Sequence, residues 1–318
     1  MDASSNAGHS KSHSLEVKWW PLRLLITGAS GLFGSRLAEA ALKRGFLVYS
    51  GSRKDLPLHG VPVFFDISDK VQVSDAFEKV HPDVVVHCAS LTDVDKCELN
   101  RELAWKTNVA GTEHVAEEAG ESRAFLVYVS TDYVFNGQKG CYGENDKPDP
   151  VNYYGVTKLE AERVVEDRLK DYCIARASVI YGSTPAAGKI NFALWLLNKL
   201  RAKERVKIIV DQWISPTLNT NMADMTLEIV ERRLTGIFNV SGATRISRFD
   251  FAELLAKVFS LDAGLIDAVE AAGFPWVAKR PRDSSLDTAK AQKILKNKPL
   301  KVNQALRRLK QELPQIPH

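Results

Sequence analysis

A tyrosine and a lysine stand four residues apart in the stretch YYGVTK, residues 153–158. If this stretch begins a helix, Tyr154 and Lys158 lie on one face of it, one turn apart. A free tyrosine has a pKa of about 10, which is too high for an efficient proton relay at neutral pH. A nearby ammonium group favours the phenolate, so the spacing predicts that Lys158 lowers the pKa of Tyr154. The same residues also fit an ordinary helix packed on a core, so other parts of the chain must decide.

A glycine-rich loop, TGASGLFG, joins an apolar run to a segment with helical spacing. Its first glycine permits a tight turn, the second lets the backbone approach a pyrophosphate, and the third lets the helix pack closely on the strand. The helix N-terminus then offers free N–H groups and a positive dipole end to phosphate oxygens. The loop residues that we expect to contact a dinucleotide are Gly28, Ser30, Gly31, Leu32, Phe33 and Gly34.

The residues after the second expected strand indicate which dinucleotide the loop binds. An acidic residue there would hold the ribose 2′-hydroxyl and favour NAD(H), but the stretch VYSGSRK contains none. Arg53 can accommodate a 2′-phosphate instead, which favours NADP(H). Asp55 lies two residues further on and keeps NAD(H) as the alternative.

Apolar runs and helical spacings alternate in the first half of the chain, as in a parallel sheet with helices on both faces. The run PDVVVHCA lacks polar alternation, which is typical of a strand buried on both faces. The expected strands are 22–27, 46–50, 61–66, 82–89, 124–130 and 172–182, and the expected helices are 31–45, 70–80, 98–120 and 153–169.

The alternation loosens after Gly182, where we expect helices at 191–204 and 219–234 and strands at 206–213 and 236–242. The pattern predicts an α/β fold, a Rossmann-type doubly wound parallel sheet with a smaller C-terminal substrate-binding lobe. The expected parts are a flexible tail at 1–20, an NADP(H)-binding domain at 21–182 that 217–242 rejoin, and a substrate-binding lobe made from 183–216 and 243–318.

The composition is that of an ordinary soluble globular protein, with 318 residues, 45% hydrophobic and 26% charged. A net charge of +4, without a basic cluster among aromatics, argues against nucleic acid. The four cysteines form no C-x-x-C pair and no metal-ligand spacing with histidine, so we expect free thiols, a reducing cytoplasm and no metal. The chain shows neither a signal peptide nor an apolar run of membrane-spanning length, so no membrane partner is expected.

Seven motifs occur in an order that resembles the dTDP-4-dehydrorhamnose reductase family of extended short-chain dehydrogenases/reductases. They are TGASGLFG, VVVHCASLTDVDKCE, TNVAGT, STDYVFNG, YYGVTK, DQWISPT and KRPRDSSLD. The resemblance covers about residues 22–312. The glycine loop and the Tyr-x-x-x-Lys pattern belong to the wider superfamily, whereas STDYVFNG and TDVDKCE are more particular to this family.

The resemblance implies a catalytic triad of Tyr154, Lys158 and Thr131, with Ser130 as a substitute for the hydroxyl residue. It also implies that Asn108 supports the site. Further residues expected at the cofactor are Arg53, Asp66, Ile67, Cys88, Ala89, Ser90, Asn108, Tyr154 and Lys158. Those expected at the substrate are Thr131, Tyr133, Tyr154, Val179, Asn191 and Arg282.

The chain departs from the family at two positions near the expected substrate. Bacterial members commonly carry tryptophan where this chain has Val179, and asparagine where it has Asp283. Arginine presents a planar fork of donors, so Arg280 and Arg282 are candidates for a diphosphate clamp. Phe192 and Trp213 are further candidates for the wall of the substrate site.

The expected activity is NADPH-dependent reduction of a 4-keto nucleotide sugar, dTDP-4-dehydro-L-rhamnose to dTDP-L-rhamnose by resemblance. The nicotinamide would supply hydride, Tyr154 a proton, and Thr131 would orient the carbonyl. Another nucleotide-sugar epimerase or reductase is one alternative. A second is a non-catalytic, NADP-binding regulatory subunit resembling the β-subunit of methionine adenosyltransferase, which keeps the Tyr-x-x-x-Lys pattern and also lacks the tryptophan. A homodimer is expected from the family alone.

Overall fold

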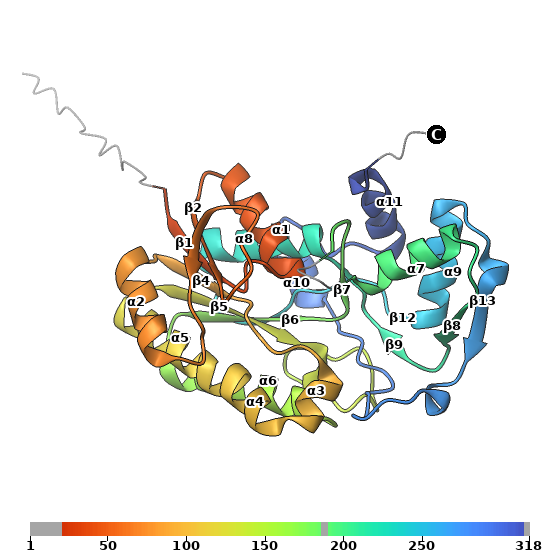
Figure 1. Cartoon of the computed structure of the whole chain (residues 1–318), viewed down its shortest axis with the longest axis horizontal. Coiled ribbons are helices and arrows are strands. Elements are labelled where there is room, and N and C mark those ends of the chain that lie inside the picture. The colour runs from red at the N-terminus through yellow and green to blue at the C-terminus, as the bar shows by residue number, and fades with distance from the viewer. Residues whose placement is uncertain (1–20, 186–189, 315–318) are drawn as a thin grey trace, which may run out of the picture.

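The computed structural model describes residues 21–185 and 190–314, and the tail expected at 1–20 lies outside the described residues. A seven-stranded sheet forms the centre of the larger part (Figure 1), in the order β11-β6-β5-β4-β1-β2-β3. All of its neighbouring strands pair in parallel. The strands are β1 (Arg23–Thr27), β2 (Leu47–Ser52), β3 (Val61–Phe64), β4 (Val84–His87), β5 (Phe125–Thr131), β6 (Tyr172–Ala177) and β11 (Gly236–Asn239). This order confirms the predicted Rossmann-type doubly wound sheet.

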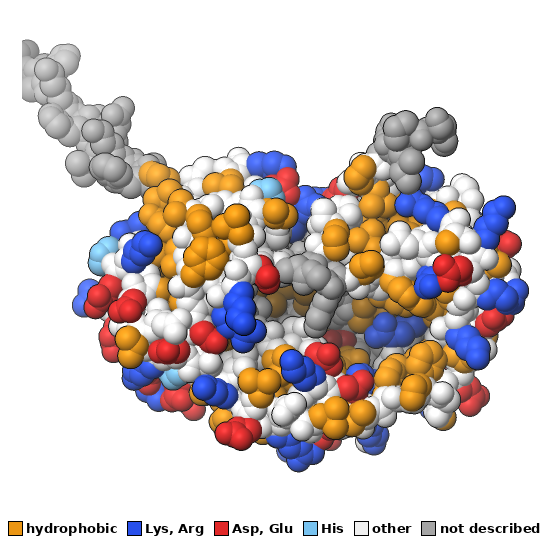
Figure 2. All heavy atoms as spheres, viewed as in Figure 1, with side chains coloured by type: hydrophobic (Ala, Val, Ile, Leu, Met, Phe, Trp, Pro, Cys, Tyr) orange, Lys and Arg blue, Asp and Glu red, His pale blue; other side chains and the backbone are white. Residues whose placement is uncertain are grey.

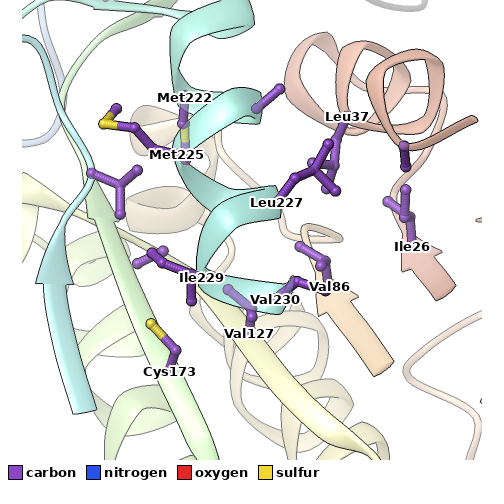
Figure 3. Close-up of a cluster of buried hydrophobic side chains, with 14 of the residues drawn as sticks. Ile26, Leu37, Val86, Val127, Cys173, Met222, Met225, Leu227, Ile229 and Val230 are labelled. Carbon is purple, nitrogen blue, oxygen red and sulfur yellow. The ribbon is translucent and has the colours of Figure 1, made fainter. Parts of the chain in front are cut away.

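Helices cover both faces of this sheet because its strands are apolar on both sides. One face is covered by α1 (Leu32–Lys43), α8 (Asn219–Arg232) and α10 (Ala289–Ile294). Figure 3 shows Ile229 and Val230 of α8 beside Cys173 and Val127 of the strands. The other face is covered by α2 (Lys70–Val80), α5 (Gly111–Glu121) and α6 (Tyr153–Arg168). Two separate apolar cores therefore hold the sheet between helices.

A third apolar core lies in the smaller part, shown beside the sheet in Figure 1. It is built from α7 (Phe192–Arg201), α9 (Arg248–Phe259), α11 (Val302–Glu312), β8 (Val206–Ile209) and β13 (Ile266–Val269). The parallel pairing of β8 with β13 was not expected from the sequence. Two short pairs, β7 (Ile180–Tyr181) with β10 (Thr217–Leu218) and β9 (Trp213–Ile214) with β12 (Ile246–Ser247), complete the described strands.

Two expected elements are divided in the structure. The strand expected at 172–182 is broken between β6 and β7, where Val179 has a φ of 37°. A β-branched residue rarely adopts this left-handed conformation, so the chain is strained there and turns away from the sheet. The helix expected at 98–120 is split into α3 (Val94–Leu99), α4 (Arg101–Trp105), a π-helical turn (Lys106–Ala110) and α5.

The helix that carries the Tyr-x-x-x-Lys pattern begins at Tyr153, as the sequence predicts. The side chain of Asn152 caps it by accepting a hydrogen bond of 2.8 Å from the backbone N–H of Gly155. A side chain at this position satisfies one of the N–H groups that the first turn leaves without a partner. The cap therefore fixes where the pattern enters the helix.

A buried ion pair ties α6 to the sheet. Arg176 of β6 donates from Nε to Oε1 of Glu162 at 2.9 Å and from Nη2 to Oε2 at 2.6 Å. Both side chains are about 2–3% exposed. Ser130 of β5 donates to the same carboxylate at 2.5 Å. Because these charges are cut off from water, they must be satisfied by one another, which fixes the helix against β5 and β6.

Replacing Glu162 with glutamine should lower the free energy of unfolding by about 3–5 kcal/mol, because the Arg176 guanidinium then stays buried without its counter-charge. Urea unfolding of wild-type and variant protein measures this difference. Glu160→Gln is the matched control, since Glu160 forms a partly exposed pair with Arg163 on the same helix. That control should cost about 0–1 kcal/mol. Equal losses for the two variants would show that the buried pair does not anchor the helix.

Candidate active site

A cavity of about 890 Å³ lies at the carboxyl ends of β1, β2, β4 and β5, where open α/β sheets bind ligands. Figure 2 shows the molecule hollowed between its two parts on this side. The first turn of α1 closes one wall, and Asn191 and Phe192 at the start of α7 approach from the smaller part. The cavity therefore lies where the sheet and the small part meet.

Most residues that the sequence assigned to a site line this one cavity. They are Gly28, Ser30, Gly31, Leu32, Phe33, Gly34, Arg53, Asp66, Ile67, Cys88, Ala89, Ser90, Thr131, Tyr133, Tyr154, Lys158, Val179, Asn191 and Phe192. Asn108 and Arg282 are not among its lining residues, nor are the candidates Arg280 and Trp213. The structure therefore brings the glycine loop and the Tyr-x-x-x-Lys pattern together across the sheet.

The glycine loop is packed too closely for side chains at two of its positions. A Cβ atom on Gly34 would lie 2.4 Å from the carbonyl oxygen of Gly28, and one on Gly28 would lie 2.8 Å from the backbone nitrogen of Ala89. Gly28 also has a φ of 67°, which glycine adopts most readily. No side chain caps α1 after Gly31, so the first N–H groups of α1 remain available to a ligand. This arrangement fits the pyrophosphate of a dinucleotide.

Buried Thr27 and His87 hold the start of the loop that follows β4. Thr27 Oγ1 accepts hydrogen bonds of 3.1 Å from the backbone N–H groups of Cys88 and Ala89, and lies 2.7 Å from Nδ1 of His87. The opposite ring nitrogen of His87 lies 3.1 Å from Thr112 Oγ1. Burial lowers the pKa of His87 to about 3, so the imidazole is neutral near pH 7. His87 had no role in the sequence analysis, since a histidine within an apolar strand carries no local signal.

Asn108 lies behind the cavity wall, in the π-helical turn. Its side-chain oxygen accepts from Ser90 Oγ at 2.9 Å and from the backbone N–H of Leu91 at 2.7 Å. Its side-chain nitrogen donates to Leu91 O at 3.2 Å and to Thr157 Oγ1 at 3.0 Å. The loop after β4 is thereby joined to α6, so Asn108 holds lining residues in place without lining the cavity itself.

The far end of the cavity carries two cations after β2. Arg53 is 63% exposed and lies 3.8 Å from the carboxylate of Asp66, and Lys54 lines the cavity beside it. Asp55 lines the same end. The carboxylate of Asp66 accepts from the backbone N–H and hydroxyl of Ser68 at 2.9 and 2.8 Å. Lys54 had not been assigned by sequence, although it directly follows Arg53.

The two hydroxyl groups at the end of β5, those of Ser130 and Thr131, have different partners. Ser130 donates to the buried Glu162, so its hydroxyl is already used. Thr131 Oγ1 accepts from the backbone N–H of Tyr133 at 3.2 Å and donates to Asp132 at 3.1 Å. Asp132 is buried and also accepts from Ser178 at 2.8 Å and from Ser284 at 2.5 Å. The sequence analysis quoted Asp132 within STDYVFNG but gave it no role; burial raises its pKa.

Tyr154 and Lys158 both line the cavity but differ in the effect of burial. Burial raises the pKa of Tyr154, and the neighbouring Thr131 hydroxyl lowers it only in part. Burial lowers the pKa of Lys158 to about 7, although the Glu162 carboxylate raises it. Lys158 Nζ donates to Val129 O at 2.8 Å and lies 4.1 Å from the centre of the Tyr128 ring. The expected lowering of the pKa of Tyr154 by Lys158 is therefore wrong for this structure, because burial raises the pKa of Tyr154 and Lys158 is not among the groups that shift it.

The residues expected at the substrate are only partly brought together. Tyr133, Val179 and Asn191 line the cavity, and the rings of Tyr133 and Tyr154 meet edge to face with 6.1 Å between their centres. Arg282 is exposed, and its guanidinium lies 5.7 Å from the centre of the Trp213 ring outside the cavity lining. Its expected role as a diphosphate ligand stays a prediction.

Replacing Lys158 with methionine should raise the free energy of unfolding near pH 6. In the folded protein the buried lysine is charged only below a pH of about 7. In the unfolded chain it stays charged up to a pH of about 10.4. The wild-type protein should therefore gain stability as pH rises from 7 to 10, by at most about 1.4 kcal/mol per pH unit from this group. The advantage of the variant should shrink over the same range.

Urea unfolding at pH 6, 8 and 9.5 measures the Lys158→Met effect. Lys147→Met is the control. Lys147 is exposed, so this substitution removes a charge without changing a buried site. A stability difference that does not vary with pH would contradict a lowered pKa for Lys158.

Comparison with known proteins gives one consistent family. The family model of the RmlD substrate binding domain matches residues 22–314. The chain is 33% identical over 84% of its length to the probable low-salt glycan biosynthesis reductase Agl14 of Haloferax volcanii, covering 90% of that protein. It is 31% identical over 91% of its length to dTDP-4-dehydrorhamnose reductase of Aggregatibacter actinomycetemcomitans, covering 98% of it.

Two further comparisons bear on the cavity. The crystal structure of dTDP-4-dehydrorhamnose reductase from Bacillus anthracis in complex with NADP matches with a TM-score of 0.84 and 29% identity, over 92% of this chain and 100% of that one. Methionine adenosyltransferase 2 subunit beta of Xenopus tropicalis is 30% identical over 86% of this chain and 82% of its own length.

No helix within residues 21–185 and 190–314 is long and apolar enough to cross a membrane.

Proposed function

The chain belongs to the RmlD substrate binding domain family, and on this basis we propose that it uses NADPH to reduce the 4-keto group of a nucleotide sugar. One observation carries the proposal: Thr131, Tyr154 and Lys158 line the same cavity as the glycine loop. Carbonyl reduction needs a proton-donating hydroxyl group and a dinucleotide-binding loop in one cavity.

The cavity fits NADP(H) in the residues that it offers. The backbone of Gly28, Gly31 and Gly34 leaves room for the pyrophosphate, and the first turn of α1 presents its N–H groups. Arg53 and Lys54 would hold a 2′-phosphate, since charge-assisted hydrogen bonds to phosphate are strong. When bound, the nicotinamide supplies the hydride that reduces the ketone carbon.

Within this proposal, Tyr154 is the proton donor. The raised pKa keeps its hydroxyl protonated at neutral pH, so it holds a proton for the oxygen that becomes an alkoxide. Thr131 lines the same cavity as Tyr154 and would orient the substrate carbonyl. Lys158 would hold the ribose hydroxyls and, as an ammonium, stabilise negative charge on Tyr154 after the proton has left.

The substrate most consistent with the relatives is dTDP-4-dehydro-L-rhamnose, because dTDP-4-dehydrorhamnose reductases match almost the whole chain. Val179, which stands where bacterial members commonly carry tryptophan, also lines the cavity, so the sugar and base must be tested over several nucleotide-sugar ketones. We also propose that residues 21–182 with 217–242 form the NADP(H)-binding part, and that 183–216 with 243–318 form the substrate-binding lobe.

The relative in Xenopus tropicalis supports a second candidate, a non-catalytic NADP-binding regulatory subunit. Such a protein would need the glycine loop but not the proton donor. Consumption of NADPH over a panel of nucleotide-sugar ketones, including dTDP-4-dehydro-L-rhamnose, separates the two functions. Turnover supports the reductase; NADPH binding without turnover on any of them, together with co-purification with a synthetase, supports the regulatory subunit.

Tyr154→Phe should keep NADPH affinity within about twofold and lower kcat by roughly 10²–10⁴, because only the proton donor is removed. Stopped-flow NADPH oxidation and fluorescence titration measure the two quantities. Tyr153→Phe is the matched control, since the neighbouring tyrosine does not line the cavity and should keep wild-type turnover. A Tyr154→Phe enzyme with most of its kcat would rule out this role.

Wild-type protein should bind NADPH more tightly than NADH, and Arg53→Ala should weaken NADPH binding by roughly tenfold while NADH affinity stays constant. The expected loss corresponds to one charge-assisted hydrogen bond of about 1.5 kcal/mol. Dissociation constants from fluorescence titration test both statements, with NADH as the internal control. A clear preference for NADH in the wild-type protein would assign Asp55 rather than Arg53 to the ribose.

A further inference from the structure

Arg248, the first residue of α9, belongs to the smaller part and lies behind the residues that line the cavity. Its guanidinium carbon is 5.6 Å from the centre of the Phe192 ring, and Phe192 lines the cavity. Its positive charge lowers the pKa of Tyr133 and of Asp132, opposing the effect of burial on each. Both of these residues also line the cavity. Arg248 is therefore close to three lining residues, including the tyrosine beside Tyr154.

The guanidinium is held in place by a buried amide. Arg248 Nε donates to Oε1 of Gln212 at 2.5 Å, and the backbone N–H of Arg248 donates to Gln212 O at 3.0 Å. Gln212 is 2% exposed, and its side-chain nitrogen donates to Pro281 O at 3.1 Å. With Nε engaged by Gln212, the two Nη groups can donate to a ligand.

Arg248 also differs from the neighbouring arginines in its ion pairing. Arg245 pairs with Asp283 at 2.7 Å, and Arg280 pairs with Asp95 at 3.0 Å. Arg282 is exposed beside Trp213. In the described part of the chain no carboxylate lies within 4.0 Å of the Arg248 guanidinium. Of these four arginines, Arg248 is the one that contacts the cavity wall and lacks a counter-charge among the described residues.

We propose that Arg248 binds a phosphate oxygen of the nucleoside diphosphate in the substrate, an assignment that rests on the proposed function. A guanidinium matches phosphate oxygens with a planar fork of donors and keeps its charge at all working pH values. Arg248 is half-buried and forms no ion pair with a described carboxylate, so a bound anion would supply the counter-charge that it lacks. Arg248, rather than Arg282, then sets the affinity for the anionic part of the nucleotide sugar.

The test uses NADP-loaded, full-length protein with dTDP and UDP as probes in isothermal titration calorimetry. Arg248→Gln should weaken binding of dTDP or UDP at least tenfold, and Arg248→Lys should recover part of it because the charge returns without the fork. The KM for the nucleotide sugar should rise with little change in kcat, and NADPH affinity should stay constant. Arg307→Gln, an exposed arginine of α11, controls for loss of one positive charge.

The outcomes separate this assignment from the proposed function. Wild-type nucleotide affinity in Arg248→Gln, or a tenfold loss in Arg282→Gln with none in Arg248→Gln, overturns the Arg248 assignment while leaving the reductase intact. A wild-type protein that binds NADPH but neither nucleoside diphosphate, and turns over no nucleotide sugar, removes the proposed function and this assignment with it. Unchanged thermal unfolding of Arg248→Gln shows that its loss of binding is not a loss of fold.

Discussion

The buried pair of Glu162 and Arg176 is the constraint on which the Tyr154 side of the cavity depends. Two charges removed from water are stable only with well-placed partners, and these come from α6 and β6. Ser130 of β5 donates a further hydrogen bond to the Glu162 carboxylate. Helix α6 therefore has one permitted rotation on the sheet, and this rotation turns Tyr154 and Lys158 toward the cavity.

The opposite side of the cavity is set by close packing and backbone hydrogen bonds. Gly34 and Gly28 allow α1 to approach the strand ends more closely than any side chain permits. His87 and Asn108 hold the loop after β4 through buried hydrogen bonds, without lining the cavity themselves. The glycine-loop side of the cavity is therefore fixed by close packing, whereas the Tyr154 side is fixed by a buried ion pair. Both are rigid because their polar groups are satisfied inside the protein.

Burial of the polar groups at the cavity costs stability and prepares their chemistry. The pKa of Tyr154 and of Asp132 is raised, and that of Lys158 is lowered to about 7. Each shift disfavours the charged form, which is what desolvation does. Arg248 forms no ion pair with a described carboxylate, and its guanidinium lies beside Phe192, which lines the cavity. Functional sites often retain such unfavourable arrangements because a ligand completes them.

Local patterns were sufficient to predict the parallel sheet, the start of α6 at Tyr153, and the glycine loop with its helix. These features depend on hydrophobic periodicity and turn chemistry within a few residues, which any reader of the sequence can see. The pKa of Tyr154, the use of Ser130 by Glu162, the break at Val179 and the placement of Arg248 against Phe192 were decided only by the tertiary structure. Burial and distance depend on segments far apart in the chain, such as residues 192 and 248, and no local pattern contains them.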